Sequence, residues 1–306
     1  MRKIVTTYIN PDMDGLSIMY AYTEYLRKTG NNANYYFEGS LKKEAEIILD
    51  YFNIKLDNIV DISDTDEIII VDTNSLRELS TRIMKDKIIE IIDHHKQEDW
   101  LNDANNINVH IELIGAAATL VAEMFKNNNI DISREAAILL YYGIISNTMN
   151  LKIKLTSAKD IEMANWLQSR IPEITEDVTN EIFEKKSMIG DNLREEMEVE
   201  FKDQFMNISW SMGQLEIANV DNFLQQYEQS IRNILNQVSK ENDVEYISVN
   251  CMDVINGYSV IIANDEKVVK LITDATGIKF ENLKARVNEL LSRKEIVKII
   301  REIYHN

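Results

Sequence analysis

The sequence predicts an α/β protein with an N-terminal doubly wound parallel sheet and a second, smaller α/β domain. Its 306 residues exceed the ~100–200 residues of a typical domain, so we expect two domains. In the first half, short apolar runs alternate with segments of helical length, which is typical of a parallel sheet with crossover helices. Only two prolines and nine glycines interrupt the chain, so most of it should be regular structure.

Five strands are expected in the first half, and each is a short apolar run. They are Lys3–Ile9, Ala33–Glu38, Glu67–Thr73, Lys87–Ile92 and Val109–Leu113. The run at 67–73 is rich in β-branched residues without polar interruption, which favours a strand buried on both faces. The first strand is followed by a turn at residues 10–15, where Asn, Pro, Asp and Gly are all turn formers.

Helices are expected between and after these strands. They are Leu16–Lys28, Leu41–Phe52, Leu76–Lys85, Ala116–Asn127, Arg134–Ser146 and Ser157–Leu167. Gly30 should end the first of them. Ser75 and Glu78 have the spacing of a capping box, which predicts the start of the third.

A polar stretch that opens at Pro172 divides the chain. We expect a metal-binding domain over residues 1–170, a helical linker and hinge over 171–196, and a substrate-binding domain over 197–306. In the last part, strands are expected within Met206–Ile217 and Tyr246–Ala263, and helices at Asp221–Ser239, Glu266–Thr273 and across most of Phe280–Tyr304.

Charge and composition exclude several classes of function. The net charge of −18 disfavours sequence-independent binding to long nucleic acid, although bound divalent cations would allow a small anionic substrate. No apolar run approaches the ~20 residues that span a bilayer, and the N-terminus does not resemble a signal peptide. The single cysteine, Cys251, excludes an internal disulfide and is expected in the core. A cytoplasmic protein without a membrane partner is expected.

Acidic residues and histidines follow three of the expected strands. Asp12 and Asp14 come after the first, Asp72 after the third, and Asp93-His94-His95 after the fourth. The carboxyl ends of parallel strands share one edge of a sheet, so these side chains should converge there. Carboxylates that close together repel one another unless a divalent cation neutralises them. Mixed carboxylate and imidazole ligands suit Mn²⁺, Co²⁺ or Mg²⁺.

Each residue also has a structural explanation. Asp12 would serve the turn after Pro11, and Asp72 would be a loop or cap residue. The joint pattern after three separate strands favours the metal site. His110 and His305 lack such neighbours and are expected to be structural.

The motifs together resemble a known family. Residues 10–14, Asp72 and Asp93-His94-His95 are similar to the motifs of the DHH phosphoesterase superfamily, and residues 142–148 resemble its fourth motif. Ser292-Arg293-Lys294 resembles the signature of manganese-dependent (family II) inorganic pyrophosphatases, whose second domain is of the DHHA2 type. The glycine- and histidine-rich motif of the nanoRNase-like branch is missing from the second half of the sequence.

This resemblance implies a divalent-metal-dependent phosphohydrolase that cleaves pyrophosphate or short polyphosphate with metal-activated water. It implies Mn²⁺, with Co²⁺ or Mg²⁺ as alternatives, two ions bridged by Asp72, and a homodimer. The implied metal ligands are Asp12, Asp14, Asp72, His94 and Asn147, and the implied catalytic residues on the substrate side are His95, Arg293, Lys294 and Lys202, the last placed by approximate alignment. The second domain would close over the first to bring its cations to the phosphates.

The sequence departs from the family at three positions. Tyr8 stands where the first motif begins with histidine, Asn147 where the fourth ends in aspartate, and Thr73 where pyrophosphatases commonly carry histidine. A phenol with a pKa of about 10 is a poor ligand at neutral pH, and an amide brings no charge. A weakened paralogue that binds a phosphorylated ligand therefore stays open as an alternative.

The sequence leaves two further functions to compare with the phosphohydrolase. A phosphodiesterase for very short oligonucleotides or cyclic dinucleotides would need aromatic faces for the bases; Trp210 and Tyr258 are available, although we expect both in the core. A generic nucleotide-binding module fits less well, because no Gly-x-x-x-x-Gly-Lys or Gly-x-Gly-x-x-Gly run follows a predicted strand.

Overall fold

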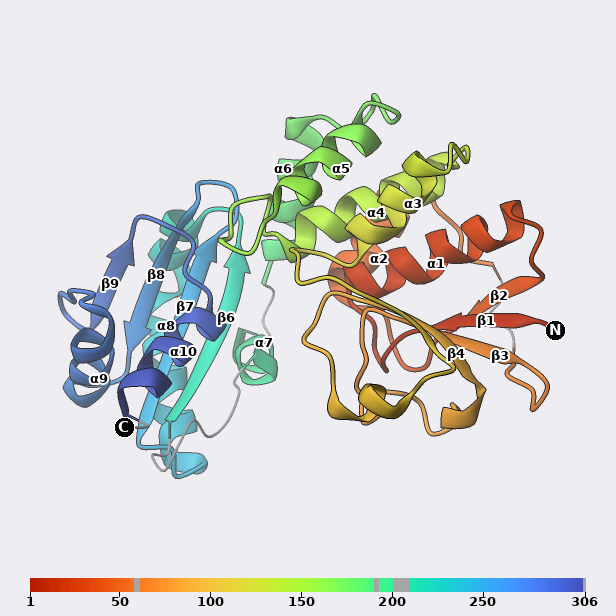
Figure 1. The fold of residues 1–306 in the computed structure, drawn as a ribbon. Helices are drawn as coiled ribbons and strands as arrows, with labels where there is room; N and C mark the ends of the chain where they lie inside the picture. Colours follow the sequence, from red (N-terminus) through yellow and green to blue (C-terminus); the bar gives the residue numbers. More distant parts are fainter. Residues whose placement is uncertain (58–60, 190–192, 201–209, 305–306) are drawn as a thin grey trace. The chain divides into compact units, whose positions relative to one another are not determined.

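The computed structural model describes residues 1–57, 61–189, 193–200 and 210–304. The chain divides into two compact units, Met1–Thr179 and Asn180–Asn306 (Figure 1). Each unit has its own sheet, five-stranded in the first and four-stranded in the second. The predicted α/β class with a second, smaller domain is therefore confirmed. In the described residues, no helix is both long and apolar enough to span a membrane.

The first unit is built on a parallel sheet with the strand order β2-β1-β3-β4-β5. Its strands are β1 (Lys3–Thr6), β2 (Ala33–Tyr36), β3 (Glu67–Val71), β4 (Ile88–Asp93) and β5 (Asn108–Ile111). The chain moves from β1 outward to β2 and then crosses back to β3 on the other side of β1. The strand order reverses at this point, so the carboxyl ends of β1 and β3 border the crevice where ligands bind in open α/β sheets.

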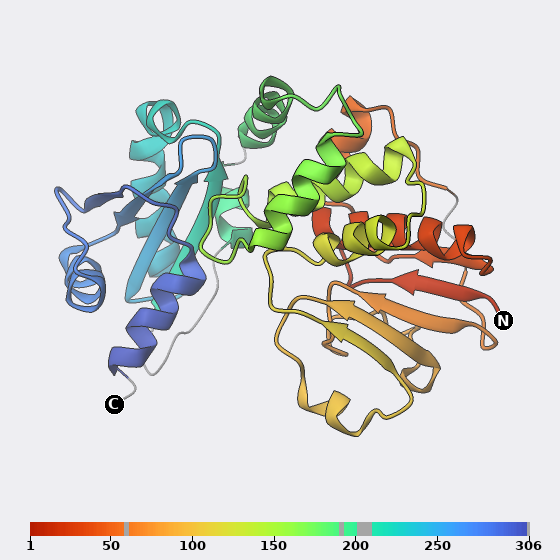
Figure 2. The same ribbon diagram turned by 45° about the horizontal axis from the view of Figure 1, so that its top comes forward.

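Helices pack against one face of this sheet. The helices of the unit are α1 (Met13–Lys28), α2 (Lys43–Tyr51), α3 (Ala118–Asn127), α4 (Arg134–Asn147), α5 (Ala158–Gln168) and the start of α6 (Glu176–Ser187). Figure 2 shows α1, α3 and α4 together on that face. The helices α1 and α4 approach closely at Gly143, where an added Cβ would lie 3.0 Å from the Cβ of Ala118 and in contact with Ser17. Fully buried aliphatic side chains such as Ile69 and Leu139 fill the interior.

The opposite face of the sheet is covered by turns, and the predicted helix at 76–85 is wrong. This segment forms separate turns in place of a helix, closed by the N–H groups of Glu78 and Ile83, and short 3-10 helices follow at Lys85–Lys87 and Asp99–Asp103. The hydroxyls of Thr73 and Ser80 accept the backbone N–H groups of Ser75 (3.1 Å) and Arg82 (3.2 Å), so they stabilise local turns that compete with a helix. Glu78 accepts a hydrogen bond from the Thr73 hydroxyl and does not complete a capping box.

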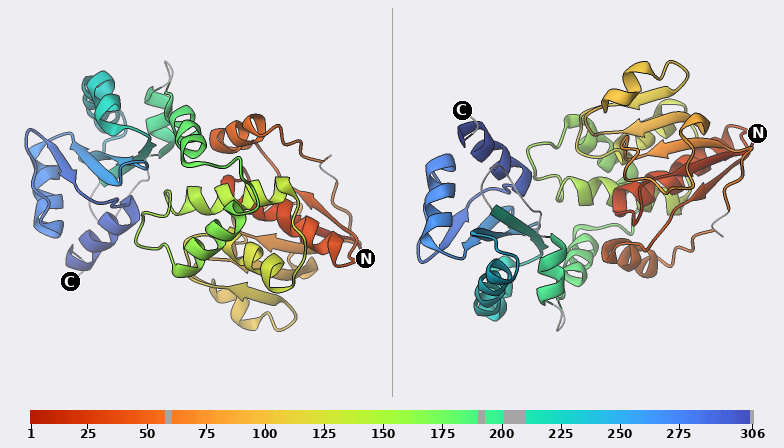
Figure 3. Two further views of the ribbon diagram at one scale, coloured as in Figure 1. Left: turned by 90° about the horizontal axis from the view of Figure 1, so that it is seen from above. Right: turned by 90° about the horizontal axis from the view of Figure 1, so that it is seen from below.

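The second unit has a mixed sheet with the order β6-β7-β8-β9. Its strands are β6 (Trp210–Ile217), β7 (Tyr246–Asp253), β8 (Tyr258–Ala263) and β9 (Lys284–Val287), and its helices are α7 (Leu193–Glu200), α8 (Val220–Glu241), α9 (Glu266–Thr276) and α10 (Arg293–Tyr304). The strands β6 and β7 are parallel and the other pairs antiparallel. One hydrophobic cluster lies between the sheet and α8, and another lies between the sheet and the helices α9 and α10. The helix α8 therefore covers one face of the sheet, and α9 and α10 cover the opposite face (Figure 3).

The prediction of a largely helical segment at 280–304 is wrong in its first part. Residues 284–287 form β9, which pairs with β8, and the helix begins only at Arg293. Gly277, with a φ of 75°, ends α9 in the left-handed conformation and lets the chain turn back toward the sheet.

Candidate metal centre

Asp12 reaches the edge of the first sheet because it is the N-cap of α1. Its Oδ1 accepts the backbone N–H groups of Asp14 (2.9 Å) and Gly15 (3.2 Å). Asn10, with a φ of 58°, provides the turn that leads from β1 into this cap. The turn role expected for Asp12 is therefore present, and its carboxylate also stands beside the other acidic residues of this edge.

Asp14 lies in the first turn of α1 and is 1% exposed. Its carboxylate bonds to the start of α3, where Oδ2 accepts the N–H of Ala117 (2.8 Å) and Oδ1 the N–H of Ala118 (2.8 Å). Oδ2 also accepts the side-chain amide of Asn147 (2.6 Å). Burial and the charge of Asp12 nevertheless raise the pKa of Asp14 well above its ordinary value, since these hydrogen bonds offset them only in part.

Asp72 follows β3 directly and is 2% exposed. Its backbone takes a φ of 60°, and its N–H continues the sheet by donating to Ile92 (2.9 Å). Oδ2 accepts the hydroxyl of Tyr8 (3.3 Å). Oδ1 has no hydrogen-bond partner within the described part of the chain and lies 3.5 Å from Nε2 of His94. Burial, followed by the charges of neighbouring aspartates, raises the pKa of Asp72 well above its usual range.

Asp93, at the end of β4, orients the two histidines. Its Oδ1 accepts the backbone N–H groups of His94 (2.7 Å) and His95 (3.2 Å), and it lies 2.9 Å from Nδ1 of His95. The amide of Asn74 donates to Oδ2 (2.5 Å). Burial opposes the charge on Asp93, but the hydrogen bonds from His95 and Asn74 outweigh it, and the pKa of Asp93 lies below its ordinary value.

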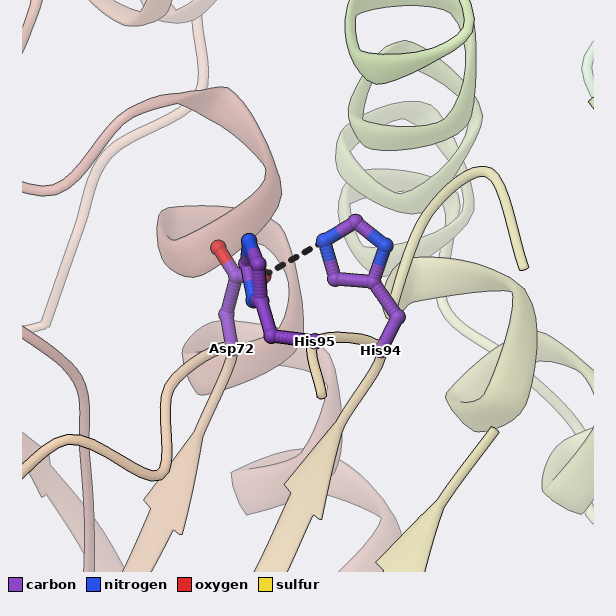
Figure 4. Close-up of side chains that lie close together, drawn as sticks. All are labelled: Asp72, His94 and His95. Atoms are coloured by element: carbon purple, nitrogen blue, oxygen red, sulfur yellow. Dashed lines mark ion pairs between the residues drawn. The ribbon is translucent and has the colours of Figure 1, made fainter. Parts of the chain in front are cut away.

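The two imidazole rings face Asp72 from the β4 end (Figure 4). Nδ1 of His94 lies 3.0 Å from the carbonyl oxygen of Ile114, so the proton of the neutral ring belongs on Nδ1 and Nε2 carries a lone pair toward Asp72. Each of three residues, Asp72, His94 and His95, offers one ligand atom. These three atoms lie within 4.8 Å of one another, a spacing that can hold a metal ion.

Tyr8 and Asn147, two of the three departures from the family motifs, are both part of this edge. The Tyr8 hydroxyl donates to Asp72 and accepts the backbone N–H of Asp12 (3.3 Å). Burial, together with the charges of Asp72 and Asp12, raises the pKa of Tyr8 far above its ordinary value, so the phenol stays neutral. The amide nitrogen of Asn147 lies 2.6 Å from Asp14 and 3.4 Å from Nε2 of His94.

The structure brings six of the predicted site residues together. They are Asp12, Asp14, Asp72, His94, His95 and Asn147, all in the first unit. Arg293 and Lys294 lie in the second unit, at the start of α10. The Arg293 backbone N–H donates to Gln214 (2.9 Å) and its guanidinium to the carbonyl of Met212 (3.3 Å), while Lys294 is exposed. Lys202, predicted to contact substrate, and His305 lie outside the described residues.

Two other predictions concern the interior of the second unit. Trp210 and Tyr258 are buried, at 1% and 7% exposure, which confirms the core interpretation and leaves neither ring open as a stacking surface for bases. Cys251 is fully buried, as expected. Sequence reasoning missed Asn74, whose amide oxygen accepts the N–H of Glu98 (2.7 Å) while its nitrogen holds Asp93. Its position two residues after Asp72 was the available signal.

Residues 2–144 match the DHH family, N-terminal domain. The first half of the chain is therefore similar to the N-terminal domain of that family. The full chain is also 27% identical over 306 residues, 97% of both chains, to a protein of Streptococcus thermophilus named "Probable manganese-dependent inorganic pyrophosphatase". A protein of the same name from Bacillus cereus is 24% identical over 308 residues, 99% of both chains. The predicted resemblance is thereby confirmed.

The fold of the whole chain agrees with that of a solved structure. The crystal structure of a "putative family II inorganic pyrophosphatase" from Methanococcus jannaschii covers 100% of both chains with a TM-score of 0.72 at 24% identity. This likeness shows that the two units of this chain share the fold of that structure.

Proposed function

We propose that this protein is a divalent-cation-dependent phosphohydrolase that cleaves the phosphoanhydride bond of pyrophosphate or short polyphosphate. The observation that carries the proposal is the buried Oδ1 of Asp72. It faces Nε2 of His94 at 3.5 Å and has no hydrogen-bond donor in the described residues. A buried carboxylate oxygen without a donor is costly, and a cation would relieve that cost.

The residues present fit a cation such as Mn²⁺. Asp12 and Asp72 offer carboxylate oxygens and His94 an imidazole nitrogen, a donor set that suits Mn²⁺, Co²⁺ or Mg²⁺. The raised pKa of Asp72 comes from burial and like charges, the condition that a bound cation removes. The names of the two bacterial relatives, which specify manganese, make Mn²⁺ the first cation to test.

The substrate side would be cationic and donor-rich. When bound, a divalent cation supplies charge neutralisation and acidifies water. Asp93 accepts a hydrogen bond from Nδ1 of His95 and so orients that ring; in the protonated imidazolium, Nε2–H would donate to a phosphoryl oxygen. Arg293 and Lys294 would bind the remaining phosphate charge; Gln214 and Met212 fix the position of Arg293 at the head of α10. Lys202 remains a further candidate for this role.

The proposal is tested with the full chain in the presence of Mn²⁺. Phosphate release is measured from pyrophosphate and from tripolyphosphate, with Arg293→Met as a variant that should lose activity and Arg301→Met, on the exposed surface of the same helix, as its matched control. Release that depends on both Mn²⁺ and Arg293 supports the proposal. If neither substrate is cleaved while Mn²⁺ is bound, the protein is not a pyrophosphatase or polyphosphatase.

A weakened hydrolase that serves mainly to bind a phosphorylated ligand is the second candidate. The hydrogen bonds from Tyr8 to Asp72 and from Asn147 to Asp14 favour it, because both use carboxylate oxygens that a cation would need. Restoring the family residues with Tyr8→His and Asn147→Asp should then raise turnover sharply. A wild-type chain that already turns over rapidly with Mn²⁺ would eliminate this candidate.

A further inference from the structure

The amide group of Asn147 lies between a carboxylate and an imidazole. Its nitrogen is 2.6 Å from Oδ2 of Asp14 and 3.4 Å from Nε2 of His94, and these two atoms are 4.0 Å apart. Oδ2 of Asp14 also accepts the N–H of Ala117 (2.8 Å), so two donors already occupy the two lone pairs of this oxygen. The oxygen of Asp14 that faces His94 is therefore saturated.

The surrounding atoms determine which way the amide points. Nδ1 of His94 is engaged with the carbonyl oxygen of Ile114 (3.0 Å), so Nε2 is an acceptor in the neutral ring. Asp14 presents acceptors only. An amide oxygen placed here would face a carboxylate oxygen and a lone pair, whereas the amide nitrogen can donate to both. The N–H group thus bridges Asp14 and His94 in the way that a shared cation would, without its charge.

Tyr8 has the same relation to the other carboxylates. Its hydroxyl donates to Oδ2 of Asp72 (3.3 Å) and accepts the backbone N–H of Asp12 (3.3 Å). Of the carboxylate oxygens of Asp14 and Asp72, only Oδ1 of Asp72 is left without a hydrogen-bond donor in the described residues. The side chain of Asp72 is 2% exposed, and its Oδ1 points at the imidazole of His94 (Figure 4).

We infer that this chain binds one divalent cation, at Oδ1 of Asp72 and Nε2 of His94, and that the Asn147 amide replaces a second ion between Asp14 and His94. The inference rests on the cation site of the proposed function and departs from the ion pair implied by the family resemblance. When the cation binds, the 3.4 Å contact between Asn147 and His94 is lost, while the hydrogen bond from Asn147 to Asp14 remains.

The test is the number of Mn²⁺ ions bound per full-length chain. We expect about one in the wild type by titration calorimetry and by metal analysis after dialysis, and about two in Asn147→Asp, which restores a charged ligand. Electron paramagnetic resonance should show isolated Mn²⁺ in the wild type and an exchange-coupled pair in Asn147→Asp. Two controls should stay at about one ion: Asn147→Ala, which removes the amide without adding charge, and Asn222→Asp, which adds the same charge in an exposed turn of α8.

The outcomes separate this inference from the proposed function. One ion without phosphate release supports the inference and rejects the hydrolase, and two coupled ions with phosphate release do the reverse. The wild-type count decides the inference even if Asn147→Asp fails to fold. Two ions in the wild type, or an Asn147→Asp chain that is folded by circular dichroism and still binds one, would overturn it.

Discussion

Asp72 and Asp93 end neighbouring strands of the same sheet, both are buried, and their environments are opposite. Asp93 accepts hydrogen bonds from Asn74 and from the backbone and ring of His95, which hold its pKa below the ordinary value. Asp72 has one hydroxyl donor and several like charges nearby, so burial raises its pKa. The charge of Asp93 therefore stabilises the folded protein, and that of Asp72 destabilises it until a cation binds.

Replacing Asp72 should separate stability from cation binding. For Asp72→Asn without cation, we expect the free energy of unfolding at pH 7 to rise by about 1 kcal/mol, because the amide removes a buried charge that desolvation and neighbouring aspartates disfavour. A raised carboxyl pKa costs stability as pH rises above about 4, so the gain should vanish in acid. Urea unfolding across pH 3–8 measures this, and calorimetry should show that Mn²⁺ no longer binds.

Asp93→Asn is the matched comparison. It removes a charge that is well hydrogen-bonded, so it should lower the free energy of unfolding by about 2 kcal/mol. The interpretation of the two aspartates would be wrong if both variants shifted stability in the same direction at pH 7.

Arg2 and Asp66 form a paired contact far from the metal centre. The Arg2 guanidinium donates to both carboxylate oxygens of Asp66, at 2.8 and 2.5 Å, and Ser63 N–H adds a third bond (2.7 Å). The hydrogen bond from Arg2 is the main reason that the pKa of Asp66 is lowered. A bidentate pair with a buried carboxylate is among the stronger ion pairs.

Asp66→Asn should lower the free energy of unfolding by about 2 kcal/mol at neutral pH. A carboxyl with a lowered pKa contributes stability above its unfolded pKa of about 4 and loses it as pH falls through the folded pKa. The difference between wild type and variant should therefore shrink below pH 4 in urea titrations. Asp64→Asn, at an exposed neighbouring position, should change little at any pH; a pH-independent deficit in Asp66→Asn would contradict the ion-pair explanation.

At the scale of elements, α1 and α4 meet where Gly143 leaves no room for a methyl group. An added Cβ would contact Ser17 and lie 3.0 Å from the Cβ of Ala118. Both helices hold site residues, Asp14 in the first turn of α1 and Asn147 at the end of α4. The spacing between the helices therefore controls how close these two side chains lie.

Gly143→Ala should destabilise the protein, because overpacking costs about 1–3 kcal/mol while alanine gains about 1 kcal/mol as a helix former. In a Ser17→Ala background the nearest contact is removed, so the cost should fall by about 1 kcal/mol. Thermal unfolding of the four chains in this cycle measures the coupling. Equal effects of Gly143→Ala in both backgrounds would show that Ser17 does not limit the approach.

The elements show where sequence patterns succeed and where they fail. The β-branched run at Glu67–Val71 forms a buried strand because it has no competing polar contacts. The helix start predicted from Ser75 and Glu78 is wrong because Glu78 accepts a hydrogen bond from the Thr73 hydroxyl. That hydroxyl also accepts the backbone N–H of Ser75 and stabilises a turn there. β9 was missed because its pairing with β8 depends on a partner about 25 residues away in sequence.

At the scale of the whole molecule, the described residues that we expect to bind cation all lie in the first unit. A fragment ending at Ser187, which keeps α6 whole, should bind Mn²⁺ with the stoichiometry of the full chain. It should not release phosphate from pyrophosphate, because Arg293 and Lys294 are gone. Calorimetry and a phosphate assay on the fragment, beside the full chain, measure both. Hydrolysis by the fragment at the full-chain rate would show that the second unit is dispensable.

The convergence of the site could be predicted, because parallel strands bring their carboxyl ends to one edge and three motifs follow such strands. The individual hydrogen bonds could not. No spacing rule links Asp14 to Ala117 and Ala118, more than 100 residues away, or turns the Asn147 amide toward a carboxylate. These contacts depend on the packing of α1, α3 and α4, which only the folded chain defines.

Asp14 supports the start of α3 through two backbone hydrogen bonds, whatever chemistry the edge performs. Selection for folding alone would preserve this aspartate in a lineage that had given up hydrolysis. The presence of Asp14 is therefore not evidence of hydrolytic activity. Within the described part of the chain, Tyr8 and Asn147 make no hydrogen bond to the backbone of α3. The residues at positions 8 and 147 therefore distinguish active relatives from inactive ones better than Asp14 does.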